Sequence, residues 1–315
     1  MTAHVELPSW RALAAPIDDA SLVRVPEDWP NRELSRIVLS GGRAWHVQEC
    51  GQGYPVLLLH GTGAATHSWR RLAPALSSDA RVLMVDLPGH GYTETLLGET
   101  LSLESMSAAV GALLNDLAFV PRVIIGHSAG AAIALQLELD GHGRPTTTIG
   151  LNAALQPYGG PFQPLLALLS GSVAASPWLV DRIVSRASDR RSIARLLEST
   201  GSVIDGEGAS HYQRLMMRHE HVRGVLSMMA AWRLGSLLEN LDRLGSELVM
   251  ITARGDKAVR PRDAERVRRW RPDARIVSVD GGHLVHEEQP DEIAELIQTI
   301  IRRDGDDTTR EGGAG

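Results

Sequence analysis

The sequence is poor in the features that mark secreted, membrane-spanning or nucleic-acid-binding proteins. Its single cysteine, Cys50, excludes an internal disulfide and favours a reducing compartment. It lacks a basic surplus: 38 acidic residues oppose 32 basic ones and the net charge is −6, which argues against a nucleic-acid partner. It also lacks a signal-peptide pattern and any apolar run near the roughly 20 residues of a membrane span. We therefore expect a cytoplasmic protein, and membrane contact stays open.

The sequence does contain a series of short apolar runs that have the length of β-strands. They lie at residues 55–60, 81–86, 122–127, 146–152, 247–253 and 274–280. Strands that are apolar on both faces are typical of a parallel sheet covered by helices. Two further segments, 36–39 and 44–49, are joined by a Gly-Gly pair and predict a hairpin.

Helical patterns separate these strands and give the chain an alternating order. They run over residues 66–76, 102–117, 128–140, 262–270 and 291–301. Alternation of strand and helix predicts an α/β protein with a mostly parallel, doubly wound sheet.

The alternation is interrupted once, where residues 156–241 have helical patterns and no convincing strand. We interpret this segment as a helical lid inserted over one end of the sheet. The chain then divides into an N-terminal extension, a first core part, the lid, a second core part and a disordered polar tail, at residues 1–35, 36–155, 156–241, 242–302 and 303–315.

The stretch VIIGHSAG carries the strongest chemical signal in the chain. It places Ser128 directly after an expected strand and at the start of an expected helix. Such a serine is held on a sharp turn with its hydroxyl exposed, and Gly126 and Gly130 allow strand and helix to fold back on each other. The five-residue pattern is weak by itself, but in this strand–turn–helix context it predicts a nucleophile.

A serine hydroxyl needs a base, and the base needs an acid to orient it. Asp256 lies just beyond the expected strand 247–253, and His283 lies just beyond the strand 274–280. Because the carboxyl ends of parallel strands share one edge of a sheet, both side chains can meet Ser128 there. The order Ser, Asp, His along the chain fits a catalytic triad.

Each partner of the serine has a rival. His286 follows His283 by three residues and is expected to enter the next helical turn, so we favour His283. Asp280 is too close in sequence to His283 to approach it from the opposite side, so we favour Asp256.

The developing oxyanion needs backbone donors, and two loops supply candidates. One is the amide of Ala129, directly after the nucleophile, and the other is the amide of Thr62 in HGTGAATHSW, with Gly63 as second choice. We expect no cofactor and no metal, since a triad needs none and His211, His219 and His221 have no metal-ligand spacing.

Five segments taken in order, HGTGAATHSW, DLPGHGY, GHSAG, ARGDKAV and GGHLVHEEQP, resemble the α/β-hydrolase superfamily. The resemblance spans residues 36–301 and implies an α/β-hydrolase fold with a Ser-His-Asp triad. The segments DWPNR, LNAALQPYGG and HVRGVLSMMAAW resemble the BchO family of magnesium-chelatase accessory proteins in bacteriochlorophyll biosynthesis. That narrower resemblance implies a role near magnesium insertion into protoporphyrin. It names a tetrapyrrole as candidate small-molecule substrate and magnesium chelatase as candidate partner.

Three functions stay open. The first is a serine hydrolase of an ester or related acyl bond; the alternatives are a non-catalytic tetrapyrrole-binding or delivery protein and a general carboxylesterase.

The lid arginines either form a solvated helix face, which we favour, or pair with porphyrin propionates; they are Arg182, Arg186, Arg190, Arg191 and Arg195. The lid also holds residues that either line a pocket or form its core: Met216, Met217, Met228, Met229, Trp178 and Trp232.

Overall fold

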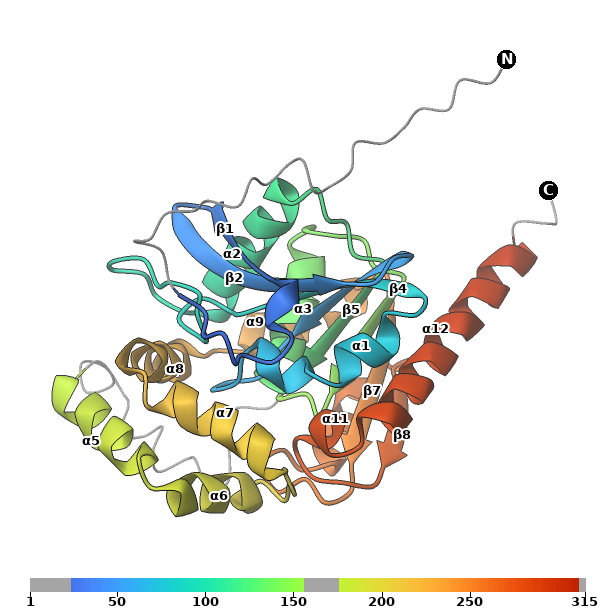
Figure 1. The fold of residues 1–315 in the computed structure, drawn as a ribbon. Coiled ribbons are helices and arrows are strands. Elements are labelled where there is room, and N and C mark those ends of the chain that lie inside the picture. The colour runs from blue at the N-terminus through green and yellow to red at the C-terminus, as the bar shows by residue number, and fades with distance from the viewer. Residues whose placement is uncertain (1–23, 156–175, 312–315) are drawn as a thin grey trace.

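Figure 1 shows one β-sheet with helices on both faces and a group of helices at one end. The computed structural model describes residues 24–155 and 176–311, with side chains to residue 302. The start of the expected N-terminal extension, the first part of the expected lid and residues 312–315 lie outside the described residues.

Eight strands form the sheet in the order β1-β2-β4-β3-β5-β6-β7-β8. They are β1 Ser35–Ser40, β2 Arg43–Cys50, β3 Tyr54–Leu59, β4 Ala80–Val85, β5 Val123–His127, β6 Thr147–Leu151, β7 Glu247–Ala253 and β8 Arg275–Val279. From β4 to β8 along the sheet all neighbours are parallel, whereas β2 is antiparallel to both β1 and β4. Every expected strand is present, and the predicted α/β fold is confirmed.

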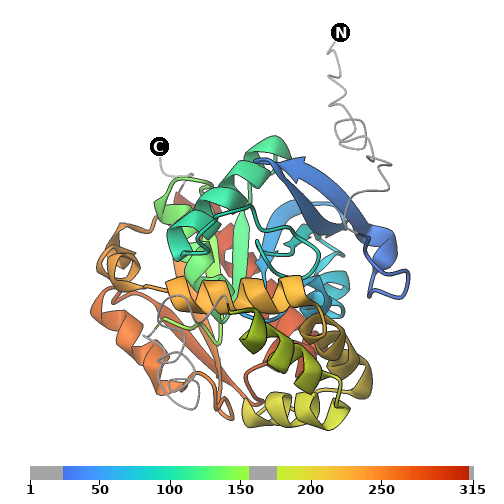
Figure 2. The same ribbon diagram turned by 90° about the vertical axis from the view of Figure 1, so that its left-hand side faces the viewer.

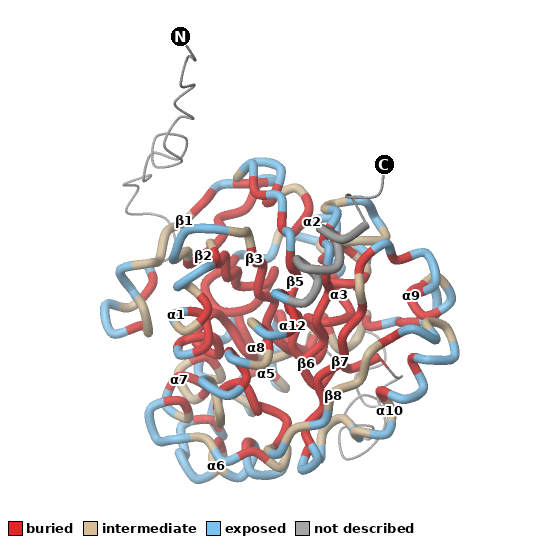
Figure 3. The backbone as a smooth tube through the Cα atoms, turned by 90° about the vertical axis from the view of Figure 1, so that its right-hand side faces the viewer, coloured by how far each residue is buried: buried red, intermediate tan, exposed pale blue. Residues whose placement is uncertain are grey.

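Successive side chains of each strand point to opposite faces and enter two separate hydrophobic layers. On one face Leu57 and Ile124 pack with helices α2 (Leu103–Asp116) and α3 (Ala129–Leu139). On the other face Val56 and Ile125 pack with α1 (Leu72–Leu76) and α12 (Pro290–Glu311). Figure 3 shows the central strands buried between these layers, which explains their uninterrupted apolar sequence.

Two expected helices are divided in the structure. Residues 66–76 form a 3-10 helix, η3 (Thr66–Trp69), followed by α1. Pro74 has no N–H to donate to the carbonyl of Arg70, and that carbonyl accepts a hydrogen bond from Asn31 Nδ2 at 3.0 Å instead. Residues 262–270 likewise form a short α10 (Arg262–Glu265) and a 3-10 turn, η5 (Arg266–Arg269).

The last helix is longer than the sequence predicted. Helix α12 continues to Glu311, so residues 303–311 are helical where we expected a disordered tail. Buried Ile293, Ile297 and Ile300 fix the helix against the sheet. Extending an existing helix is far easier than nucleating one, so the polar residues that follow can continue it.

Helices fill the described part of the segment between β6 and β7, which contains no strand. They are α5 Pro177–Ala187, α6 Arg190–Ser199, α7 Gly206–Met216, α8 His219–Ala231 and α9 Gly235–Glu239. Helices α5 to α8 lie together at one end of the sheet (Figures 1 and 2). Within them Met228 and Trp232 join the main core, whereas Trp178 and Met217 are exposed, so the sulfur and indole side chains do not share one role. Across residues 24–155 and 176–311 we find no helix that is both long enough and apolar enough to cross a membrane.

Asp86 is a fully buried carboxylate that ties three segments together. Its Oδ1 accepts a hydrogen bond from the Thr66 amide at 2.7 Å, and its Oδ2 accepts one from the Tyr92 amide at 2.8 Å. His46 Nδ1 lies 2.7 Å from the same Oδ2. Burial favours the neutral acid, but His46 and the hydrogen bonds outweigh it and hold the pKa of Asp86 below its ordinary value.

We predict that Asp86→Asn lowers the free energy of unfolding by about 3 kcal/mol, because it removes a buried carboxylate that accepts hydrogen bonds from two backbone amides and lies against His46. Urea denaturation measures this. Asp79→Asn, which alters an exposed carboxylate 3.6 Å from Arg302, is the matched control and should change stability by no more than about 0.5 kcal/mol.

The difference between wild type and Asp86→Asn should also depend on pH. Folding lowers the pKa of Asp86, so its stabilisation is present above the unfolded value near 3.8 and is lost as the pH falls below it. A difference that stays constant from neutral pH into acid would contradict this assignment.

Candidate active site

Ser128 stands between β5 and α3 in a backbone conformation that few residues other than glycine adopt. Its φ is 53° and its ψ is −116°. Such a conformation persists only where the surroundings enforce it. Here the Ser128 amide donates to the Leu151 carbonyl at 2.9 Å, and the Ala154 amide donates to the Ser128 carbonyl at 3.1 Å. The neighbouring strand β6 and the residues after it therefore hold the turn.

The glycines on either side of the serine are required by close packing. A Cβ on Gly130 would lie 2.2 Å from the carbonyl oxygen of Leu59 at the end of β3. A Cβ on Gly126 would lie 2.4 Å from the backbone of Ala131. Side chains at these positions would force strand and helix apart, as the sequence predicted.

His283 and Asp256 meet beyond the ends of β8 and β7. His283 Nδ1 lies 2.8 Å from Asp256 Oδ2, and both residues are less than one tenth exposed. The other oxygen of Asp256 accepts hydrogen bonds from the amides of Ala258 and Val259, each at 2.8 Å. When Nδ1–H of His283 donates a hydrogen bond to this carboxylate, Nε2 is the ring nitrogen left to act as a base.

The two rival residues have other partners. His286 is fully buried against the rings of Trp69 and His127, and burial, reinforced by His283, lowers its pKa to about 3. Asp280 is exposed and pairs with Arg254 at 2.6 Å. Neither side chain is placed to serve Ser128 as base or acid.

His127, which precedes Ser128, supports the loop that carries His283. Its Nε2 lies 2.9 Å from the His283 carbonyl oxygen, and the two rings are 4.7 Å apart between centroids. Because a carbonyl only accepts, Nε2 carries the proton. Burial, and then the neighbouring histidines, keep the pKa of His127 well below its ordinary value. A neutral His127 thus brings the His283 loop beside the serine turn. In the described part of the chain, the hydrogen bonds of His283 join its Nδ1 to Asp256 and its carbonyl to His127 and Asn152, and none joins it to the Ser128 hydroxyl.

Asn152 is a structural partner of the site that the sequence reading missed. It follows β6 with a positive φ of 45° and is buried. Its Nδ2 donates to the carbonyls of Gly282 and His283 at 3.0 and 2.9 Å, and its Oδ1 accepts from the Ala253 amide at 2.7 Å. The Asn152 side chain therefore connects two segments. One is the end of β7, which leads to Asp256, and the other is the loop that contains His283. A polar residue directly after a buried strand at this edge was the available signal.

The loop after β3 runs against the serine turn. A Cβ on Gly61 would lie 3.0 Å from the Cβ of Ser128. His60 fixes this loop, since its Nδ1 lies 2.8 Å from the Gly61 carbonyl while its Nε2 accepts from the Leu87 amide at 2.9 Å. Thr62 follows in that loop. Ala129 is the first residue of α3, so its amide has no partner within the helix.

The remaining histidines of the inserted helices have separate partners. His211 lies near Glu207, His219 lies 3.2 Å from Asp181, and His221 accepts from the Gly91 amide at 3.0 Å. Within the residues that the structure describes, no group of three or more His, Cys, Asp or Glu side chains is arranged to hold a metal ion.

Comparison with known proteins gives a consistent assignment. A family model described as alpha/beta hydrolase fold matches residues 54–290. The magnesium-chelatase 30 kDa subunit of Rhodobacter capsulatus is 37% identical over 276 residues, which are 87% of this chain and 96% of that protein. The 2-hydroxy-6-oxo-2,4-heptadienoate hydrolase of Pseudomonas putida is 35% identical over 108 residues, 33% of this chain and 39% of that protein. A crystal structure of an alpha/beta hydrolase fold protein from Burkholderia ambifaria has the same fold, with a TM-score of 0.69 at 20% identity. The superposition covers 84% of this chain and 97% of the Burkholderia chain.

We predict that Asn152→Ala slows the reaction of Ser128 with a fluorophosphonate by about 10- to 100-fold, because the His283 loop loses two hydrogen bonds that hold it beside the serine turn. The rate of adduct formation, followed by intact mass, is the measurement. Asn115→Ala, at an exposed position in the last turn of α2, should react like wild type. If folded Asn152→Ala also reacts at the wild-type rate, Asn152 does not position His283.

Proposed function

The chain belongs to the α/β hydrolase fold family, together with the magnesium-chelatase 30 kDa subunit of Rhodobacter capsulatus, and we propose that it is a serine hydrolase. The observation that carries this proposal is the 2.8 Å contact between His283 Nδ1 and Asp256 Oδ2 beside a strained Ser128. A buried imidazole with a carboxylate on Nδ1 and a strained serine nearby are the parts that acyl transfer needs.

In the proposed mechanism, the Ser128 hydroxyl oxygen attacks a carbonyl carbon and gives its proton to Nε2 of His283. Asp256 stabilises the imidazolium that forms, and the amides of Ala258 and Val259 keep its carboxylate in place. The amides of Thr62 and Ala129 stabilise the oxyanion. His283 then protonates the leaving group, and water, deprotonated by His283 in turn, releases the acid from Ser128.

The substrate bond in this proposal is an ester or a related acyl bond. A serine nucleophile forms an acyl-enzyme that water can hydrolyse. Relatives of this fold that open epoxides or remove halides resemble it but use an aspartate at the position of Ser128. The Ser128 hydroxyl therefore favours acyl chemistry over those reactions.

The pathway is a second part of the proposal. The identity to the magnesium-chelatase 30 kDa subunit extends over 87% of this chain, whereas the hydrolase of Pseudomonas putida matches only 33% of it. We therefore propose a role at the magnesium-chelatase step, with a tetrapyrrole as candidate small-molecule substrate and the chelatase as candidate partner. A non-catalytic role in binding or delivering the tetrapyrrole is the alternative that the same similarity favours.

Ser128→Ala tests the chemistry directly. We expect wild-type protein to gain one fluorophosphonate adduct on Ser128, and Ser128→Ala to gain none. Ser199→Ala, on the exposed side of α6, is the matched control and should react like wild type. Hydrolysis of an activated ester should fall at least about 1,000-fold in Ser128→Ala, since triad serines contribute at least that much. Adduct formation at another residue, or full activity without Ser128, would refute the proposed nucleophile.

The same variant separates catalysis from delivery. In a bacteriochlorophyll-producing host that lacks the corresponding gene, we expect the wild-type chain to restore pigment and folded Ser128→Ala to fail. Restoration of pigment by Ser128→Ala at wild-type levels would favour a non-catalytic carrier. Rapid ester hydrolysis by the wild-type chain with no effect on pigment would favour a general carboxylesterase.

A further inference from the structure

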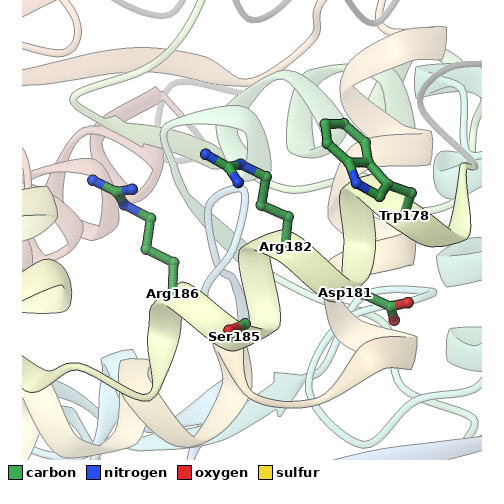
Figure 4. A pocket seen from close by; sticks show the side chains of 5 residues that line it. All are labelled: Trp178, Asp181, Arg182, Ser185 and Arg186. Carbon is green, nitrogen blue, oxygen red and sulfur yellow. The ribbon is translucent and has the colours of Figure 1, made fainter.

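Helix α5 carries a hollow lined by residues that do not belong to the candidate triad. Figure 4 shows Trp178, Arg182 and Arg186 extending from the same side of the helix, while Asp181 and Ser185 lie on another side. These five residues line a space of about 450 Å³. The hollow is more open than enclosed, so a ligand there would lie against the helix with one side in solvent.

The two arginines place two positive charges on one side of α5, in a protein whose net charge is −6. Both are exposed, and neither forms an ion pair with any residue in the described part of the chain. The nearby acid, Asp181, is turned toward His219, at 3.2 Å. Like charges four residues apart on one helix face repel, so this arrangement slightly destabilises an isolated helix. The guanidinium groups are therefore available to an anionic ligand.

Trp178 adds a flat apolar surface to the same row. Its side chain is 68% exposed, and the guanidinium of Arg182 lies 6.0 Å from its ring centroid. The packing of α5 against α8 uses a different stripe, in which Val180 contacts Val222 and Leu226. Trp178 is thus not needed for the core of the inserted helices, and its indole is free to stack on a ligand.

We propose that this hollow binds a planar aromatic compound carrying two carboxylates, the chemistry of dicarboxylic tetrapyrroles. The compound stacks on Trp178, and its two carboxylates pair with Arg182 and Arg186 through the planar fork of each guanidinium. Four residues of helix separate the two arginines by about 6 Å along the axis, so they reach two acid groups on one edge of a macrocycle. The identification of the ligand as a tetrapyrrole rests on the proposed function. The hollow deepens that function by adding a binding surface outside the Ser128 triad.

The test is an equilibrium titration of the full chain with deuteroporphyrin, a dicarboxylic porphyrin, and with its dimethyl ester. We expect the diacid to bind wild type at least about 10-fold more tightly than the ester. Arg182→Gln and Arg186→Gln should each weaken binding of the diacid by about 10-fold, because each removes a charge-assisted pair. Arg190→Gln, at an exposed arginine of α6 outside the hollow, is the matched control and should bind within twofold of wild type.

The titration measures binding of the diacid without turnover, so its outcome does not depend on whether Ser128 is a nucleophile. Equal affinity for diacid and ester, equal effects of all three arginine variants, or no binding at all would overturn the proposed site. Anionic phospholipid vesicles are a second probe. Vesicle binding that Arg182→Gln and Arg186→Gln abolish, without any preference for the porphyrin diacid, would overturn the proposal in favour of a membrane surface.

Discussion

The geometry of the candidate site depends on one close approach, between the first turn of α3 and the end of β3. Gly130 permits it, because any Cβ there would collide with the carbonyl of Leu59. The approach forces the chain to reverse between β5 and α3, and Ser128 takes its positive φ as a result. It also presses the loop at Gly61 against Ser128. The candidate nucleophile and the candidate oxyanion donors therefore come together through a single packing contact.

Buried hydrogen bonds then hold the loops that this contact leaves without regular structure. Asn152 joins the segments that precede Asp256 and contain His283, and Asp86 joins η3 to the loop after β4. Glu287, four residues after His283, binds Arg70 and accepts from the Tyr212 hydroxyl at 2.6 Å, which links this loop to the inserted helix α7. Buried polar groups are costly unless they are paired, so these networks favour one arrangement of the loops over others.

The sequence was sufficient for those features that local patterns control. The strands were recognisable because both faces of the parallel sheet are buried, and the expected Asp256 and His283 follow strands whose carboxyl ends share one edge. Features that depend on distant contacts were not predictable. Pro74 was a local sign that residues 66–76 would not form one helix, but the contact of Asn31 with the Arg70 carbonyl joins residues far apart in the chain. Asn152 gains its role only because β6 lies beside β7. The periodicity of the inserted helices gave no reason to separate exposed Trp178 from buried Trp232, since both depend on how α5 and α8 pack.

The central claim is that Ser128, His283, Asp256 and the amides of Thr62 and Ala129 act on one carbonyl. A crystal structure of the chain after reaction with a fluorophosphonate tests this claim most directly. Our account predicts phosphorus bonded to Oγ of Ser128, and one phosphonate oxygen within about 2.7–3.1 Å of both amides. It also predicts Nε2 of His283 within hydrogen-bond distance of Oγ, with Nδ1 still paired to Asp256. An adduct whose oxygen faces away from both amides, or a His283 that contacts neither Oγ nor Asp256, would contradict the account.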